Sequence, residues 1–152
     1  MELEYLKGKN YIVYENLAKK MGLEAAAFLG YLISVDEENT GIKHPLPGNY
    51  FYANANIAMK YGLELAAFLG YLMFVDKTSE HIDNEPWFCQ TIEEVKERTG
   101  YKKKEQEKLL KKLEKLGAIK TKFLGSPQKR YILINYEKVK ELSSNIQKNK
   151  KE

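Results

Sequence analysis

This chain holds few of the residues from which catalytic centres, metal sites and extracellular scaffolds are built. It has one cysteine, Cys89, so it cannot form an internal disulfide, and a thiol in the apolar run 87–90 is expected to be buried rather than reactive. Its two histidines, His44 and His81, have no partner at the spacing of a metal site or a nucleophile–base pair, and its ten glycines form no phosphate loop. We therefore expect a protein that is not an enzyme and needs no metal or cofactor.

Long hydrophobic runs are also missing. No apolar stretch approaches the ~20 residues that span a bilayer. The N-terminus lacks the charged-then-apolar pattern of a signal peptide. We expect a cytoplasmic protein with no membrane partner.

Positive charge is present in excess, and it is unevenly distributed. Residues 1–83 hold 7 Lys/Arg against 11 Asp/Glu, whereas residues 84–152 hold 18 against 10. Residues 101–140 alone hold 13 against 4. A basic patch of this kind attracts phosphate-bearing partners through counterion release, so the second half of the chain favours a nucleic acid.

The basic half begins with the pattern of two helices joined by a tight turn. Thr91 and Glu94 have the spacing of a capping box, which predicts a helix start at Thr91, and Gly100 suits the sharp exit from that helix. Leucines at helical spacing predict a second helix over 102–116, ended by Gly117. Gln106 lies one turn before these leucines on the same side, so we expect it to be part-buried.

A hairpin should follow the second helix. Ile119, Thr121 and Phe123 alternate with lysines, residues 130–134 are rich in β-branched and aromatic side chains, and residues 125–129 have turn chemistry. Helix, turn, helix and β-wing in this order lay a helix in the DNA major groove. The predicted fold is α+β and mainly helical, a winged helix-turn-helix with an extra N-terminal helical repeat.

The candidate DNA contacts lie on the second helix and the wing. Lysines reach phosphates rather than bases, so we expect limited sequence readout. The alternative is that lysines opposite a leucine stripe are simply a solvated face. The candidate DNA-binding residues are Lys102, Lys103, Lys104, Glu107, Lys108, Lys111, Lys122, Gln128, Lys129 and Arg130.

The acidic half contains an internal repeat with an offset of forty residues. Residues 22–36 and 62–76 are identical at twelve of fifteen positions, and an aromatic, β-prone run precedes each copy. Each copy reads as a short strand, a short helix and a longer helix that ends at Val35 or Val75. The stretch from Asp36 to Asn49 should be the loop between the copies. We expect a repeat unit over 1–48, a winged-helix domain over 49–142 and a polar basic tail over 143–152.

Small residues in both copies allow two helices to approach closely, which suggests that the long helices pack together within one chain or across a homodimer. The alternative is that each helix is buried in its own local core. The candidate packing residues are Ala26, Ala27, Gly30, Tyr31, Ala66, Ala67, Gly70 and Tyr71.

Several segments together resemble a known group of domains. They are residues 17–26, the Trp87-Phe88 pair, and the stretches 91–94, 105–108, 112–119 and 134–138. These resemble the winged-helix domains of phage and mobile-element replication proteins, including replisome organisers and relatives of the DnaD primosome family. The resemblance covers about residues 50–142. Such domains normally have one copy of the repeated helix, and many continue into a C-terminal domain.

The resemblance implies a protein that binds double-stranded DNA in replication initiation or its control. A replication or host protein would be a further partner. The alternative is a protein-interaction module, or a small transcriptional or anti-host regulator, that uses the duplicated aromatic helices and binds DNA weakly or not at all.

Overall fold

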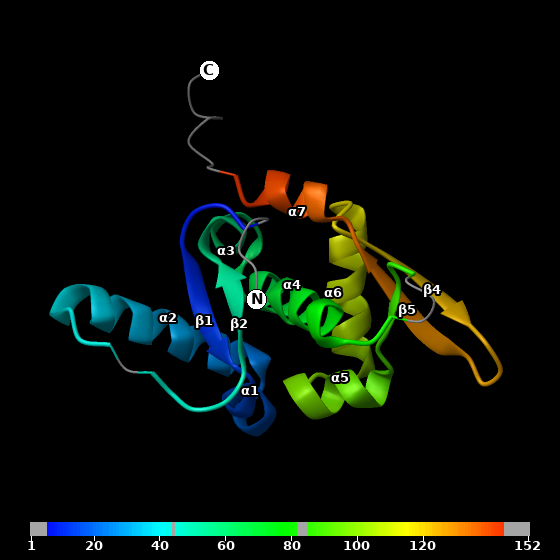
Figure 1. The fold of residues 1–152 in the computed structure, drawn as a ribbon, viewed down its shortest axis with the longest axis horizontal. Coiled ribbons are helices and arrows are strands. Elements are labelled where there is room, and N and C mark those ends of the chain that lie inside the picture. Colours follow the sequence, from blue (N-terminus) through cyan, green and yellow to red (C-terminus); the bar gives the residue numbers. More distant parts are fainter. Residues whose placement is uncertain (1–5, 44, 82–84, 145–152) are drawn as a thin grey trace, which may run out of the picture.

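The computed structural model describes residues 6–43, 45–81 and 85–144, which form an α+β fold with two small antiparallel sheets (Figure 1). The first half contains two similar units. The first unit is β1 (Asn10–Tyr14), α1 (Glu15–Met21) and α2 (Leu23–Thr40), and the second is β2 (Tyr50–Asn54), α3 (Ala55–Tyr61) and α4 (Leu63–Thr78). The predicted order of strand, short helix and long helix is confirmed in both copies.

The two units are joined through their strands. β1 pairs antiparallel with β2, and Ile12 lies directly opposite Tyr52. These residues are forty apart, which is the offset of the repeat. Because equivalent residues of the two copies pair at the centre of this two-stranded ribbon, an approximate two-fold axis through the ribbon relates the two copies. The long helices α2 and α4 also pack against each other within the chain.

α2 is longer than predicted. It continues past Val35 to Thr40, where the Thr40 hydroxyl donates to the Asp36 carbonyl at 2.9 Å and Gly41 ends the helix with a φ of 73°. The expectation that the loop begins at Asp36 was therefore wrong. Short polar residues at 36–40 resemble a loop, but in the structure they extend the exposed end of the helix.

The second half follows α4 with a helix pair and a hairpin. Its elements are β3 (Phe88–Cys89), α5 (Ile92–Thr99), α6 (Lys103–Lys115), β4 (Ile119–Leu124), β5 (Lys129–Ile134) and α7 (Tyr136–Leu142). The strands form one sheet in the order β3-β5-β4. In Figure 1 the β4–β5 hairpin projects from the body of the molecule, and α7 leads the chain back toward α3.

α4 is the central element of the core. Its side chains from Leu65 to Val75 are all buried, and it contacts β2, α2, α3 and α6. Buried side chains of the two halves form one continuous hydrophobic cluster. The repeat and the helix pair therefore share a core around α4.

A polar contact also connects the first unit to the helix pair. Arg98 on α5 forms an ion pair with Glu15 at the start of α1, whose side chain is almost fully buried. The Arg98 guanidinium also lies 5.5 Å from the Tyr71 ring centroid. The second unit has Ala55 where the first has Glu15. The first unit thus holds α5 through a contact that the second unit does not have.

Candidate nucleic-acid interface

The α5–α6 pair is positioned by its local sequence. The Thr91 hydroxyl accepts from the Glu94 N–H at 3.2 Å, and the Glu94 carboxylate accepts from the Thr91 N–H at 3.1 Å, which confirms the predicted capping box. Gly100 has a φ of 81° and its N–H donates to Lys96, so the chain leaves α5 through the left-handed backbone that glycine allows. α6 then runs from Lys103 to Lys115, within one residue of the prediction at each end.

α6 has one apolar face and one basic face. Its buried side chains are Gln106, Leu109, Leu110 and Leu113. The opposite side chains are exposed, and among the described residues none of these lysines forms an ion pair with a carboxylate. We call this set the α6 face; it consists of Lys102, Lys103, Lys104, Glu107, Lys108 and Lys111.

The structure corrects the expected role of Arg130. Its side chain should have contacted DNA from the wing, but Arg130 is only 4% exposed. Because β5 turns alternate residues inward, Arg130 points to the core with Ile132, while Lys129 points outward. Its guanidinium donates to the Gln106 side-chain oxygen at 2.8 Å and to the Gln90 carbonyl at 3.2 Å. Burial lowers the pKa of Arg130.

Arg130 belongs to a buried polar network between the helices and the sheet. The Gln106 amide donates to the carbonyls of Ile92 and Tyr101, at 3.0 and 2.8 Å, and the Tyr71 hydroxyl donates to the Gln90 side chain at 2.5 Å. Gln106 was expected to be part-buried on the leucine side, and it is fully buried there. The network therefore fixes α6 relative to α4, β3 and β5. Sequence reasoning missed it because an arginine beside a turn is usually solvated.

The other wing candidates lie in two environments. Gln128 and Lys129 are exposed at the end of the hairpin. Lys122 is half-buried, with its ammonium nitrogen 4.1 Å from the centroid of the Trp87 ring. A cation at this distance is attracted by the ring face. Lys122 is therefore engaged within the protein, whereas Gln128 and Lys129 are open to a partner.

Carboxylates lie near the first turn of α6. Hydrogen bonding with Glu64 and repulsion by its charge raise the pKa of Glu24, and desolvation and the charge of Glu105 add to this shift. The Tyr101 hydroxyl donates to Glu64 at 2.9 Å. Burial raises the pKa of this hydroxyl well above its usual range. An acidic edge therefore borders the α6 face on the side of the repeat.

The packing candidates of the two copies differ in burial. Ala26, Ala27, Ala66 and Ala67 are buried, as are both glycines. Tyr71 is fully buried, but Tyr31 is 37% exposed.

The glycines do not serve the contact between the long helices. A Cβ on Gly30 would lie 2.1 Å from the Ile12 carbonyl oxygen, and one on Gly70 would lie 1.8 Å from that of Tyr52. Each glycine instead lets its long helix approach the strand of its own copy. The α2–α4 contact predicted from the repeat exists, but Gly30 and Gly70 have a different role from the one proposed.

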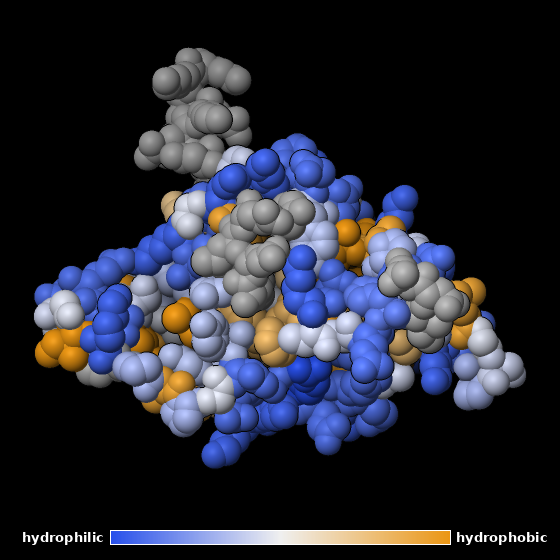
Figure 2. Space-filling model, in the orientation of Figure 1, coloured by the Kyte–Doolittle hydropathy of each residue, from blue (hydrophilic) through white to orange (hydrophobic). Residues whose placement is uncertain are grey.

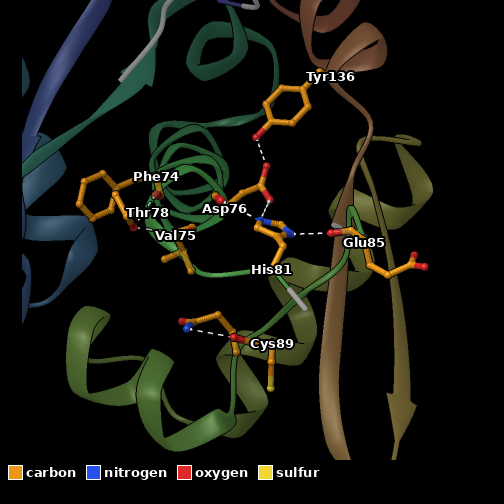
Figure 3. A network of polar contacts seen from close by, with 9 residues as sticks. Phe74, Val75, Asp76, Thr78, His81, Glu85, Cys89 and Tyr136 are labelled. Atoms are coloured by element: carbon orange, nitrogen blue, oxygen red, sulfur yellow. Dashed lines mark hydrogen bonds and ion pairs between the residues drawn. The ribbon is translucent and has the colours of Figure 1, made fainter. Parts of the chain in front are cut away.

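His81 has a structural position at the end of α4 (Figure 3). Its ring nitrogens lie 3.0 Å from the Asp76 carbonyl oxygen and 2.8 Å from the Glu85 carbonyl oxygen, and the Asp76 carboxylate also accepts from the Tyr136 hydroxyl. The hydrogen bond to the Asp76 backbone, together with the nearby Asp76 charge, raises the pKa of His81. These contacts join α4, the segment that leads to β3, and α7. His44 lies outside the described residues.

Cys89 is half-buried in β3, so it is more exposed than expected, and desolvation raises the pKa of its thiol. A raised pKa keeps the thiol protonated and weakly nucleophilic. Over the described ranges, no group of three or more His, Cys, Asp or Glu side chains could hold a metal ion. No described helix has both the length and the apolar character that crossing a bilayer requires.

No protein-family model matches the chain, and neither the curated proteins nor the solved structures include a match.

Proposed function

We propose that residues 63–134 form a winged helix-turn-helix, and that this module binds duplex DNA. α4, β3, α5 and α6 followed by the β4–β5 hairpin have the order of that fold, and the sheet order β3-β5-β4 brings the hairpin beside the first short strand. In this assignment α6 enters the major groove and the turn at 125–128 lies along the neighbouring backbone.

The observation that carries the proposal is the α6 face. Five lysines, including Lys102 at the N-cap, and one glutamate leave a net charge of +4 on one side of α6, whose other side is fixed in the core. A rigid, outward-facing array of cations binds phosphates and releases their counterions. Because ammonium groups are point charges, we expect the phosphate contribution to exceed base readout.

The acidic edge limits how DNA can lie on this surface. Glu24, Glu64 and Glu105 repel phosphates near the first turn of α6. The duplex should therefore be displaced toward Lys108, Lys111 and the exposed Lys129. The sequence resemblance supports replication initiation or its control, in a phage or mobile element, as the setting of this binding.

A matched pair of double variants tests the proposal. Lys108→Glu/Lys111→Glu alters the α6 face, whereas Lys20→Glu/Lys60→Glu makes the same change in net charge at two exposed lysines of α1 and α3. Affinity for a random duplex is measured by fluorescence anisotropy between about 50 and about 200 mM salt.

We expect the α6 variant to bind roughly 100-fold more weakly and with a log–log salt slope smaller by about two units, one unit for each lysine that no longer pairs with a phosphate. The α1/α3 variant should bind within about threefold of the parent protein, because long-range charge effects are screened at these salt concentrations. Equal losses in both variants would show that binding reports only net charge, and an absence of duplex binding by the parent protein would refute the function.

The alternative function, a protein-interaction module, is favoured by a specific observation on α2. Hydrophobic side chains of this helix are exposed although their counterparts in α4 are buried. This surface can operate together with DNA binding.

A further inference from the structure

α2 carries an apolar stripe that the chain covers only in part, with the Tyr31 ring edge-on to that of Tyr11 at a centroid distance of 5.3 Å. Phe28, Leu32 and Val35 recur at spacings of four and three residues, with Tyr31 beside them, which is the spacing of a helix that packs against another helix. We call these four residues the α2 stripe. Figure 2 shows hydrophobic surface at the end of the molecule that holds α2 and the loop after it.

The repeat provides an internal comparison for this surface. Phe28, Tyr31 and Leu32 are 53%, 37% and 45% exposed, and Val35 is half-buried. Their equivalents in α4 are all buried, with the Phe68 ring 6.1 Å from that of Tyr101 and the Tyr71 hydroxyl bonded to Gln90. The equivalents are Phe68, Tyr71, Leu72 and Val75. The same four side chains thus seal an interface in one copy and are partly exposed in the other.

Between residues 22–36 and 62–76, the three differences fall outside the stripe. Ala25 replaces Leu65, Ile33 replaces Met73 and Ser34 replaces Phe74. An exposed helix position accepts a polar residue at little cost, so four unchanged apolar residues on an open surface indicate that something covers them. Single exposed apolar residues need no such explanation, but this group is contiguous.

We propose that the α2 stripe is the homodimer interface of this protein. The stripe of one copy packs against the same stripe of a second copy. An antiparallel pair of α2 helices with its two-fold axis between Tyr31 and Leu32 sets Phe28 of one protomer against Val35 of the other. The same register sets Glu24 opposite Asn39, so this pairing does not place two carboxylates face to face.

The charges around the stripe also favour a second α2 over a basic partner surface. Lys9 and Lys43 pair with Glu38 and Glu37 of α2, which neutralises two of its carboxylates within the chain. The other strongly exposed apolar side chains lie on α1, β1, β2 and α3, in the loop after α2 and at the wing tip; Met21, Ile42 and Met59 are examples, and none of them belongs to the stripe. A contact between the stripe and any of those sites would join two different surfaces, so the assembly would not close as a dimer. A contact between the stripes of two copies joins the same surface on both and gives a closed two-fold dimer.

This dimer would present two α6 faces in one particle. If the proposed DNA binding holds, on which this prediction rests, the dimer engages two half-sites that are related by an inverted repeat. The interface itself does not depend on DNA, so it can be tested without it.

The test is solution mass by sedimentation equilibrium over a wide concentration range. The parent chain is expected at twice 17.6 kDa. Leu32→Glu should weaken dimerisation by about 100-fold or more, because it places unpaired carboxylates in an apolar contact. Met59→Glu makes the same kind of change at a 76% exposed residue outside the stripe and should leave the dimer intact. Circular dichroism checks that both variants remain folded.

Crosslinking tests the geometry independently of association strength. In a Cys89→Ser background, Leu32→Cys lies beside the proposed axis and should give a disulfide-linked dimer under mild oxidation, whereas Met59→Cys should not. Raising the salt concentration should leave the dimer unaffected while it weakens duplex binding. A monomeric parent chain, or a dimer that Leu32→Glu leaves unchanged, would overturn the interface. Neither result would touch the duplex-binding test on α6.

Discussion

Replacing Arg130 should reduce stability rather than the electrostatic affinity for DNA. Arg130→Met keeps a side chain of similar length and removes the donors to Gln106 and to the Gln90 carbonyl. A hydrogen bond to a charged group contributes about 1.5–3 kcal/mol, so two such bonds give about 3–6 kcal/mol. Relief of the buried guanidinium's desolvation offsets part of this loss. We expect the free energy of unfolding to fall by about 2–4 kcal/mol.

Lys129→Met is the matched control for this prediction. It removes the same charge from the neighbouring residue, but the Lys129 side chain is exposed. Urea denaturation followed by circular dichroism should show a change of under about 0.5 kcal/mol for Lys129→Met. For duplex binding we expect the reverse order, with Lys129→Met lowering the salt slope and folded Arg130→Met keeping it. Equal unfolding midpoints for the two variants would refute the buried network as the role of Arg130.

Two further predictions concern the glycine contacts and the histidine. Gly70→Ala should lower the free energy of unfolding by about 3 kcal/mol or more, because its Cβ would lie 1.8 Å from a backbone oxygen. A Cβ at Gly41 meets no atom within 4 Å, so Gly41→Ala should cost only the roughly 1 kcal/mol of an alanine in the left-handed conformation. Equal losses of stability in thermal melts would contradict the close contact. The pKa of His81 is raised in the folded protein, so the pairing of His81 with Asp76 stabilises the fold. This stabilisation is complete below the pKa that His81 has in the unfolded chain, and it is lost as the pH rises through the pKa of His81 in the folded protein. His81→Gln should therefore be destabilising by about 0.5–1 kcal/mol at about pH 5.5 and by less at about pH 8.5, in urea titrations at both values. A loss that does not change with pH would exclude the charged pair.

Local signals in the sequence predicted the elements of the repeat, the α5–α6 pair and the β4–β5 hairpin, but not β3 or α7. Thr91, Glu94 and Gly100 specify the start and end of α5 through contacts within a few residues, so their pattern alone was sufficient. The forty-residue repeat likewise predicted two equivalent units, because identical segments have the same local preferences. Where only polar residues marked a boundary, as at 36–40, the end of the helix was misplaced.

The sequence did not reveal what depends on distant contacts. The inward turn of Arg130 follows from the register of β5 against β3 and β4, which no local pattern fixes. The role of Gly70 was misjudged for the same reason, because its neighbour is the Tyr52 carbonyl and not another helix. The different environments of Phe28 and Phe68 could not be foreseen either, since identical residues in a repeat give identical signals.

The register of the β1–β2 ribbon has a consequence for shorter versions of this protein. A chain with a single copy of the unit would leave β2 without a neighbour along either side, with unpaired backbone donors and acceptors. The ribbon is centred on equivalent residues, so β2 could then pair antiparallel with β2 of another molecule about Tyr52 and recover the same ladder. The duplication thus places inside one polypeptide a strand pairing that a single-copy chain could make only between two molecules.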